Sequence, residues 1–268
     1  MFRLDGKVAV ITGAGGVICS TLAKDMADAG AKIALLDLSL ERAQSAADVI
    51  IKNNGEALAV ETDVLSTESI ERARDSVLNR FGKVDILVNG AGGNNPKATT
   101  GPEQSFFDLP ADAIKWVFDL NFMGTVLPTQ VFGKLMADQK SGSIVNIASM
   151  ASYRPLTKIL AYSSSKSAIV NYTQWMAVHF CQNYSPEIRV NAIAPGFLLT
   201  EQNRFLLQTE DGGLTERGSS VIRSTPMARF GSPDEMSGAV IYLCSEAASF
   251  VTGVVLPLDG GFNAFSGV

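Results

Sequence analysis

The chain has 268 residues, a formal net charge of -5 and a pI near 5.0. Hydrophobic residues make up 46% of it and charged residues 18%, as in an ordinary globular protein. This length suits one α/β domain with a large buried core, so we expect a single domain over residues 1–268. The acidic balance, without a basic cluster, argues against nucleic acid and anionic membranes as partners.

Three widely spaced cysteines and one histidine narrow the chemistry further. Cys19, Cys181 and Cys244 form neither a disulfide framework nor a zinc-binding pattern. The only histidine, His179, lies in a helix-like stretch, which argues against a Ser-His-Asp hydrolase and excludes a multi-histidine metal site within one chain. We expect no metal. Without a signal-like region or an apolar run of ~18 residues, we expect a cytoplasmic protein.

Strand-like and helix-like segments alternate along the chain. In chain order we expect strand 7–12, helix 17–29, strand 32–37, helix 39–54, strand 56–61, helix 66–81, strand 84–88, helix 111–139, strand 143–148, helix 159–182, strand 188–194, helix 232–245 and strand 254–258. Ser39 is the expected N-cap of the second helix, and Pro233 stands in the first turn of the last one. The alternation predicts a doubly wound, mostly parallel seven-stranded Rossmann sheet with helices on both faces.

Two polar, glycine-containing segments interrupt this alternation. They cover residues 90–110 and 196–231, and each leaves the carboxyl end of a predicted strand. Ligands bind at the carboxyl ends of the strands in such sheets. We therefore expect both segments to be substrate loops.

A glycine-rich turn follows the first strand and opens the first helix, with the sequence TGAGGVIC over residues 12–19. Glycines let a backbone approach a pyrophosphate, and a helix N-terminus favours its negative charge. A plain tight turn is the alternative, but the strand–turn–helix context favours a dinucleotide site. The residues expected to bind the cofactor here are Gly13, Gly15, Gly16, Val17 and Ile18.

Acidic residues end the next two strands. Asp37 is expected to accept hydrogen bonds from the adenosine ribose hydroxyls and to repel a 2′-phosphate, which favours NAD over NADP. Its alternative role is to cap the following helix from the surface. Asp63 and Val64, at the third strand end, are expected near the adenine, although aspartate is also common in turns.

A candidate catalytic group follows from spacing. Tyr162 and Lys166 are four residues apart and share one helix face. A neighbouring ammonium lowers the pKa of a phenol, which is near 10 in a free tyrosine, so the pair fits a general acid/base. Ser149 ends a strand and is expected to hold a substrate oxygen. Asn121 lies within the helix 111–139, where asparagine is unfavourable; a capped kink or a water-bound polar residue is its alternative role.

Together these residues resemble the short-chain dehydrogenase/reductase family, and the resemblance covers the whole chain. The matching motifs are the turn at residues 12–19, Asn89-Gly90-Ala91-Gly92, Asn121, Ser149, Tyr162 with Lys166, and Pro195-Gly196. The resemblance implies that Tyr162 is the acid/base, Lys166 binds the nicotinamide ribose, Ser149 orients the substrate oxygen and Asn121 holds a water. It places Asn89, Ala91, Pro195, Gly196 and Thr200 beside the cofactor, and it implies a homotetramer.

The chain departs from the family pattern at three positions. Val17 and Cys19 replace two glycines of the turn, and Gly90 replaces the second asparagine of an Asn-Asn pair. A side chain at Val17 is expected to crowd the pyrophosphate. Cys19 is expected to be a small buried filler where the first helix meets the sheet, and not a redox centre.

Four further segments resemble one branch of the family, the D-mannonate oxidoreductases (fructuronate reductases). They are GGVICS at residues 15–20, NGAGGNNPKATT at 89–100, TEQNRF at 200–205 and DGGFNAFSGV at 259–268. The resemblance implies NAD(H)-dependent interconversion of D-mannonate and D-fructuronate, so a small sugar acid is the expected substrate. Amides suit hydroxyls and cations suit a carboxylate, so the substrate candidates are Asn94, Lys97, Arg154, Gln202 and Asn203. Arg154 and Lys97 lead for the carboxylate; all five are alternatively solvated loop residues.

Other functions remain open from the sequence. One is a different sugar-acid or polyol dehydrogenase, such as a gluconate 5-dehydrogenase-like enzyme, or a 3-oxoacyl reductase. An acyl-carrier substrate calls for a basic docking patch, and the amide-rich loops argue mildly against it. A non-catalytic dinucleotide-binding protein is supported only by the altered glycine turn, and the set Asn121, Ser149, Tyr162 and Lys166 argues against it.

Overall fold

The computed structural model describes residues 1–201 and 203–267, and its centre is one seven-stranded sheet in which every pair of neighbours is parallel. The strand order is β3-β2-β1-β4-β5-β6-β7. The strands are β1 (Val8–Thr12), β2 (Lys32–Asp37), β3 (Ala57–Glu61), β4 (Ile86–Asn89), β5 (Gly142–Ile147), β6 (Ile188–Pro195) and β7 (Val255–Leu258). The predicted Rossmann sheet is confirmed.

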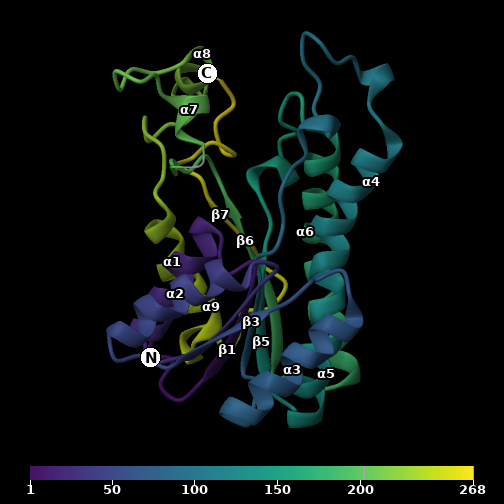
Figure 1. Cartoon of the computed structure of the whole chain (residues 1–268), viewed down its shortest axis with the longest axis vertical. Helices are drawn as coiled ribbons and strands as arrows, with labels where there is room; N and C mark the ends of the chain where they lie inside the picture. The colour runs from purple at the N-terminus through teal and green to yellow at the C-terminus, as the bar shows by residue number, and fades with distance from the viewer. Residues whose placement is uncertain (202, 268) are drawn as a thin grey trace.

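Helices cover both faces of the sheet (Figure 1). One face carries α1 (Val17–Asp28), α2 (Leu40–Lys52) and α9 (Ser237–Cys244). The other carries α3 (Thr67–Phe81), α5 (Gly124–Gln139) and α6 (Leu160–Asn183), and α4 (Ala111–Phe118) packs against α6. Two short helices follow β6, namely α7 (Arg204–Leu207) and α8 (Glu216–Arg223), and 3-10 turns lie at Pro96–Ala98, Phe106–Asp108, Met150–Ser152, Pro233–Met236 and Glu246–Ala248. No helix in the described part of the chain is long and apolar enough to span a membrane.

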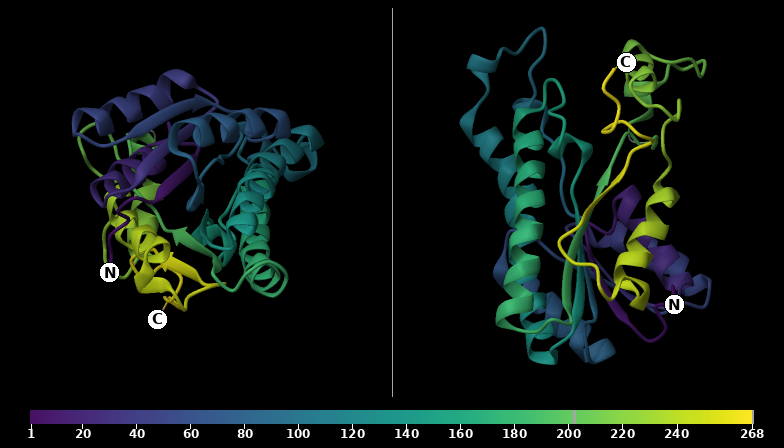
Figure 2. Two further views of the ribbon diagram at one scale, coloured as in Figure 1. Left: turned by 90° about the horizontal axis from the view of Figure 1, so that it is seen from below. Right: turned by 180° about the vertical axis from the view of Figure 1, so that it is seen from behind.

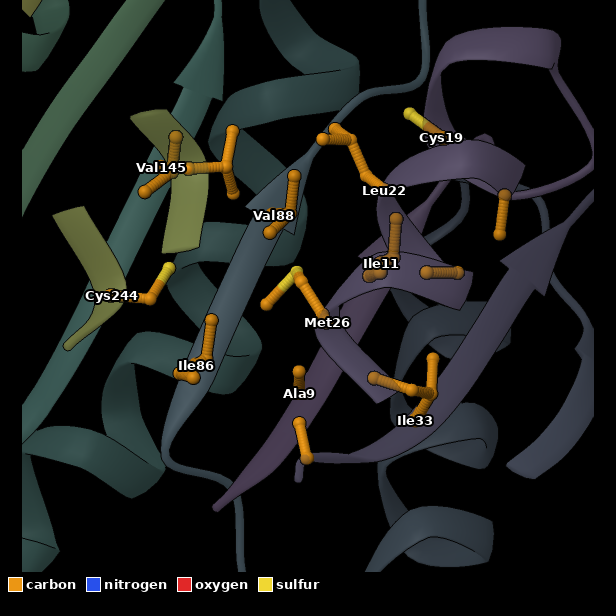
Figure 3. Packing of buried hydrophobic residues seen from close by; sticks show 14 of the residues in the cluster. Ala9, Ile11, Cys19, Leu22, Met26, Ile33, Ile86, Val88, Val145 and Cys244 are labelled. Carbon is orange, nitrogen blue, oxygen red and sulfur yellow. The ribbon is translucent and has the colours of Figure 1, made fainter. Parts of the chain in front are cut away.

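An apolar layer covers each face of the sheet. The central strands are therefore buried on both faces, as is usual for parallel strands. In Figure 3, Leu22 and Met26 of α1 lie over Ile11 of β1 and Val88 of β4. All four side chains are fully buried. Packing of this kind fixes where β1 and β4 end, and therefore where the loops that follow them begin.

The predicted helix 111–139 is interrupted. It forms α4, then one π-helical stretch at Asp119–Met123, then α5. Pro128 lies inside α5 and lacks an N–H for the helix ladder. The last predicted helix, 232–245, likewise begins as a 3-10 turn before α9. The sequence pattern predicted these helical segments but not the change in helix type, because that change depends on tertiary contacts.

Three segments rise beyond the carboxyl edge of the sheet (Figures 1 and 2). They are the loop after β4, the loop after β6 with α7 and α8, and the C-terminal segment after β7. The rings of Phe197 and Phe262 meet edge to face at 5.3 Å, which joins the second segment to the third. Arg154 Nη2 donates to the Asn263 carbonyl at 2.7 Å, which joins the C-terminal segment to the loop after β5.

Candidate active site

The glycine turn between β1 and α1 forms the floor of the site. Gly13 has φ +64°, and a Cβ there would lie 2.8 Å from Ala91 Cα, so only glycine fits. Thr12 Oγ1 accepts hydrogen bonds from the N–H groups of Gly90 and Ala91, at 3.1 and 3.3 Å, which fixes the two loops together. The N-cap of α1 is Gly16, which has no side chain to cap the helix, so its first N–H groups remain available to an anion.

Two of the three departures from the family pattern, Cys19 and Gly90, lie side by side. Cys19 is buried, and its Sγ occupies the space that a Cβ at Gly90 would need. The thiol therefore fills the room left by the missing side chain at position 90. Burial raises the pKa of the Cys19 thiol to about 12, which keeps it protonated and suits the expected role of filler.

The acid at the end of β2 is held firmly. Asp37 is 6% exposed, and its Oδ2 accepts from Gly15 N while its Oδ1 accepts from Ser39 N, both at 2.9 Å. Arg42 Nη2 adds a third hydrogen bond, to Oδ1 at 3.2 Å. Gly15, expected at the pyrophosphate, faces this carboxylate instead. Arg42 was not predicted from the sequence. Its only signal there is a basic residue five positions after Asp37, in the helix that Ser39 caps.

The residues expected near the adenine have local roles. Asp63 Oδ1 accepts from Leu65 N at 2.9 Å and so closes a turn before α3. Val64 is buried, and its Cγ2 lies 3.0 Å from the position of a Cβ on Gly124. Neither side chain lines the pocket that Asp37 lines.

Tyr162 and Ser149 line the same pocket and are joined by a hydrogen bond. Ser149 follows β5 and its Oγ accepts from Ala151 N at 3.1 Å, which orients the hydroxyl. Burial raises the pKa of Tyr162, and a hydrogen bond with Ser149 opposes this. The direction is opposite to the one expected from the Tyr–Lys spacing, because desolvation of the phenol outweighs the hydrogen bond with Ser149.

Lys166 lies next to Tyr162 and does not line the pocket. Its Nζ is 5.8 Å from the centroid of the Tyr162 ring and donates to the Ile147 carbonyl at 2.7 Å. Burial lowers the pKa of Lys166 to about 8. The ammonium is thus fixed at the end of β5, close to the pocket wall formed by Gly92, where a Cβ would come within 3.4 Å of it.

Asn121 is fully buried in the π-helical stretch and ties it to the loop after β4. Its Nδ2 donates to the carbonyls of Gly93 and Val117 at 2.7 and 2.8 Å, and its Oδ1 accepts from Gly93 N at 3.2 Å. These bonds explain an asparagine inside a helix, because the side chain supplies partners that the interrupted ladder leaves open. It positions the loop beside Lys166.

Asn89 lies below the pocket and does not line it. Its Nδ2 donates to Thr129 Oγ1 at 3.0 Å and to Asn146 Oδ1 at 2.9 Å, and all three side chains are buried. The bonds link β4 to β5 and α5. Asn89 therefore acts on the site by joining β4 to β5 and α5, and Ala91 acts through its backbone N–H, which donates to Thr12 Oγ1.

Pro195, Gly196 and Thr200 line the pocket beyond β6. Gly196 approaches the chain after β7 so closely that a Cβ would lie 2.6 Å from Asp259 Cα. Asn203, a substrate candidate, also lines the pocket, but its amide holds the loop: Oδ1 accepts from Thr200 N at 2.9 Å, and Nδ2 donates to Leu198 O at 2.8 Å.

The other substrate candidates lie outside this pocket. Asn94 Nδ2 donates to Thr99 Oγ1 at 3.0 Å, and Arg154 is joined to Asn263. Lys97 is exposed, and within residues 1–201 and 203–267 no hydrogen bond or ion pair engages its ammonium. Gln202 lies outside the described residues.

One pocket of about 470 Å³ therefore joins Asp37, the N-terminus of α1, Ser149 and Tyr162. Its glycine floor, the available N–H groups and the acid at the far end fit a dinucleotide without a 2′-phosphate. In the part of the chain that the structure describes, no three His, Cys, Asp or Glu side chains are grouped to hold a metal ion.

A sequence profile described as Enoyl-(Acyl carrier protein) reductase matches residues 13–263. The chain belongs to this short-chain dehydrogenase/reductase family. A protein named an uncharacterized oxidoreductase from Haemophilus influenzae is 50% identical to this dehydrogenase/reductase over 277 residues, which cover 99% of this chain and 96% of the relative.

Two solved structures share the fold, and both contain a nicotinamide cofactor. A provisionally named D-mannonate oxidoreductase from Haemophilus influenzae, with bound NAD, has a TM-score of 0.94 and 49% identity, and covers 99% of this chain and 98% of its own. A gluconate 5-dehydrogenase from Burkholderia cenocepacia, with NADP and tartrate, has a TM-score of 0.87 and 32% identity, and covers 98% of both chains. This member of the family is an NAD-dependent oxidoreductase.

Proposed function

We propose that this oxidoreductase interconverts D-mannonate and D-fructuronate with NAD(H). The observation that carries the proposal is the likeness to the NAD-bound Haemophilus influenzae structure, which bears that provisional name. The four distinctive segments of the sequence support it, because three of them lie at the cofactor turn or in the loops beside the pocket.

The chemistry centres on Tyr162. In the oxidising direction its Oη accepts the proton of the C5 hydroxyl of the sugar acid, and in the reducing direction it returns a proton to the ketone oxygen. Ser149 holds the same oxygen by a hydrogen bond and stabilises the charge that develops on it. NAD, when bound, supplies the hydride acceptor.

Lys166 and Asn121 do not line the pocket and act on Tyr162 and Ser149 from outside it. Lys166 places a positive charge beside the phenol and, by its bond to Ile147 O, keeps a fixed position. A positive charge there favours the phenolate that the oxidising direction needs. Asn121 holds Gly93, and through it the wall of the pocket nearest to Lys166.

The carboxylate of the sugar acid requires a cation, for which Lys97 is the stronger candidate. Its ammonium is not engaged by any described residue, whereas Arg154 already donates to the Asn263 carbonyl. Asn94, Asn203 and Gln202 remain proposed partners for the hydroxyls. We infer that Lys97 reaches the carboxylate and that Arg154 mainly holds the C-terminal segment in place.

The test is NADH formation from NAD with D-mannonate, compared with D-gluconate, D-altronate and sorbitol, and with NADP in parallel. A preference for D-mannonate of about tenfold or more in kcat/KM supports the proposal. Turnover of another sugar acid but not of D-mannonate contradicts the substrate and leaves the oxidoreductase intact. Lys97→Gln is expected to raise KM for the acid about tenfold while the KM for sorbitol, where it is turned over, stays unchanged.

A gluconate 5-dehydrogenase activity is the second candidate. It is favoured by the likeness to the Burkholderia cenocepacia enzyme, whose structure contains a hydroxy acid, tartrate. That structure also contains NADP, whereas the Asp37 carboxylate at the end of β2 is expected to repel a 2′-phosphate in this chain. Turnover of D-gluconate above D-mannonate in the same assay would establish it.

A further inference from the structure

The turn that follows β7 is held together by one carboxylate. Asp259 Oδ1 accepts from Gly261 N at 2.9 Å, and Asp259 Oδ2 accepts from Asn263 N at 2.7 Å. Gly260 and Gly261 have φ +63° and +91°, a backbone conformation that glycine adopts without strain. Asp259 does not line the cofactor pocket. Both of its oxygens instead stabilise residues 259–263, which we call the Asp259 turn.

The Asp259 turn packs against the start of the loop that follows β6. Gly196 N donates to the Leu258 carbonyl at 2.9 Å, and a Cβ on Gly196 would lie 2.6 Å from Asp259 Cα. The rings of Phe197 and Phe262 meet edge to face, with 5.3 Å between their centroids. Because Gly196 lines the cofactor pocket, the turn lies directly behind one part of the pocket wall.

The other end of the same loop also rests on the Asp259 turn. Met227 N donates to the Gly260 carbonyl at 3.0 Å, and a Cβ on Gly261 would lie 3.1 Å from Pro226 Cγ. In Figure 2 the C-terminal segment, in yellow, runs beside this loop, in green. Both ends of the segment 196–231 are therefore fixed against one short turn.

A third contact joins the Asp259 turn to the loop after β5. Phe262 packs on the apolar cluster that contains Met150, the residue after Ser149. Arg154 Nη2 donates to the Asn263 carbonyl at 2.7 Å. The turn thus holds the loop that begins with Ser149 and the loop that begins with Gly196 in one fixed arrangement.

We propose that Asp259 is a positioning residue for the nicotinamide end of NAD. Hydride transfer requires the nicotinamide ring beside the oxygen that Tyr162 and Ser149 hold, so the wall at Gly196 would hold the ring. This inference rests on the roles of Tyr162 and Ser149 proposed above. The Asp259 carboxylate stabilises the turn behind that wall and fixes it relative to the Ser149 loop. The adenosine end, at Asp37, lies on β2 and does not depend on this turn.

Calorimetric titrations with NADH and with ADP-ribose test the proposal. ADP-ribose keeps the adenosine and the pyrophosphate but lacks the nicotinamide ring. In Asp259→Asn the side chain keeps its size, but its NH2 group faces one of the two N–H donors of the turn. We expect the Kd of NADH to rise about tenfold and the Kd of ADP-ribose to stay within about twofold. Neither titration contains a sugar acid, so failure here is distinct from failure of the proposed substrate.

Asp85→Asn is the matched control. Asp85 Oδ2 also accepts from a backbone N–H, that of Val8, at 2.8 Å. It precedes β4 and therefore lies at the amino edge of the sheet, opposite the pocket. Its replacement should destabilise the fold but leave both Kd values within about twofold. A selective rise in the Kd of NADH in Asp85→Asn would show a general effect of lost stability and overturn the proposal.

Two results with Asp259→Asn would also overturn it. An equal rise in both Kd values would show that the carboxylate supports the whole pocket, and no rise in either would show that the turn does not position the ring. If Asp259→Asn does not fold, Gly261→Ala takes its place, because a methyl group at φ +91° strains the same turn and leaves the carboxylate intact. The expected and the contradicting results are then the same.

Discussion

At the residue scale, burial acts on both titratable groups of the proposed catalytic pair, Tyr162 and Lys166. It raises the pKa of Tyr162 and lowers that of Lys166 to about 8. Both shifts favour the neutral form, because a low-polarity environment disfavours charge of either sign. In the chain without cofactor, the charged forms of Tyr162 and Lys166 are therefore less favoured than their spacing in the sequence suggested.

Replacing Tyr162 by phenylalanine removes the hydroxyl that we propose exchanges a proton with the substrate oxygen. We expect kcat to fall by about 10²–10⁴, while the Kd of NADH stays within about twofold because the ring and its packing remain. Steady-state kinetics and NADH fluorescence measure the two quantities. Tyr184→Phe, at the far end of α6, is the control. Turnover that survives in Tyr162→Phe would refute the role of Tyr162.

Replacing Lys166 by methionine should stabilise the fold near neutral pH while abolishing turnover. Below pH 8 the ammonium is charged in both states, and its burial in the folded state lowers the free energy of unfolding. Removing it should raise that free energy by about 2 kcal/mol, after the lost bond to Ile147 O is deducted.

The pH dependence of the free energy of unfolding distinguishes the burial of the Lys166 ammonium from a general change in packing. Between pH 8 and about 10.4 the folded chain has lost the proton while the unfolded chain keeps it, so the stability of the unchanged chain rises with pH. The advantage of Lys166→Met should therefore shrink towards pH 10, as measured by urea unfolding at several pH values. Lys134→Met, an exposed lysine, should show no such trend. An advantage independent of pH contradicts the burial argument.

At the element scale, the sequence predicted the strands better than the helices between them. Strands such as β1 and β2 are continuous apolar runs that end in Thr12-Gly13 and Asp37, so their ends are visible in the residue order. The π-helical stretch after α4 depends on Asn121 reaching Gly93, a residue 28 positions away. No local pattern encodes such a contact, and a single long helix was the natural prediction.

The N-terminus of α1 and the loop after β4 are coupled through Cys19 and Gly90. We expect Gly90→Ala to destabilise the chain and to weaken NADH binding, because the new methyl group overlaps Cys19 Sγ and lies 2.9 Å from Thr12 O. The same change in a Cys19→Ala background should cost about 1–2 kcal/mol less, because only the clash with Thr12 O remains. Thermal unfolding of the four proteins of this cycle gives the coupling. Additive costs would contradict it.

At the scale of the whole molecule, the sequence predicted the edge of the sheet where the candidate residues meet, but not the contacts among them. Ser149, Tyr162 and Asp37 line one pocket because parallel strands deliver their carboxyl ends to one side. Gly15 N and the Asn203 amide are each engaged by a neighbour in space that the sequence did not predict. Such pairings, like that of Asp37 with Arg42, arise only once the chain is folded.

The assembly of the molecule is the remaining prediction, a homotetramer. Trp175 and Val178 are both 57% exposed on α6, beside a groove of about 590 Å³ between α5 and α6. An exposed tryptophan next to an apolar groove is a feature of subunit contacts. Light scattering should give about four times 28.5 kDa for the unchanged chain, and Trp175→Glu should lower this mass because the charge would be buried at the contact. A monomer at micromolar concentration would contradict the tetramer, and an unchanged mass in Trp175→Glu would exclude this face.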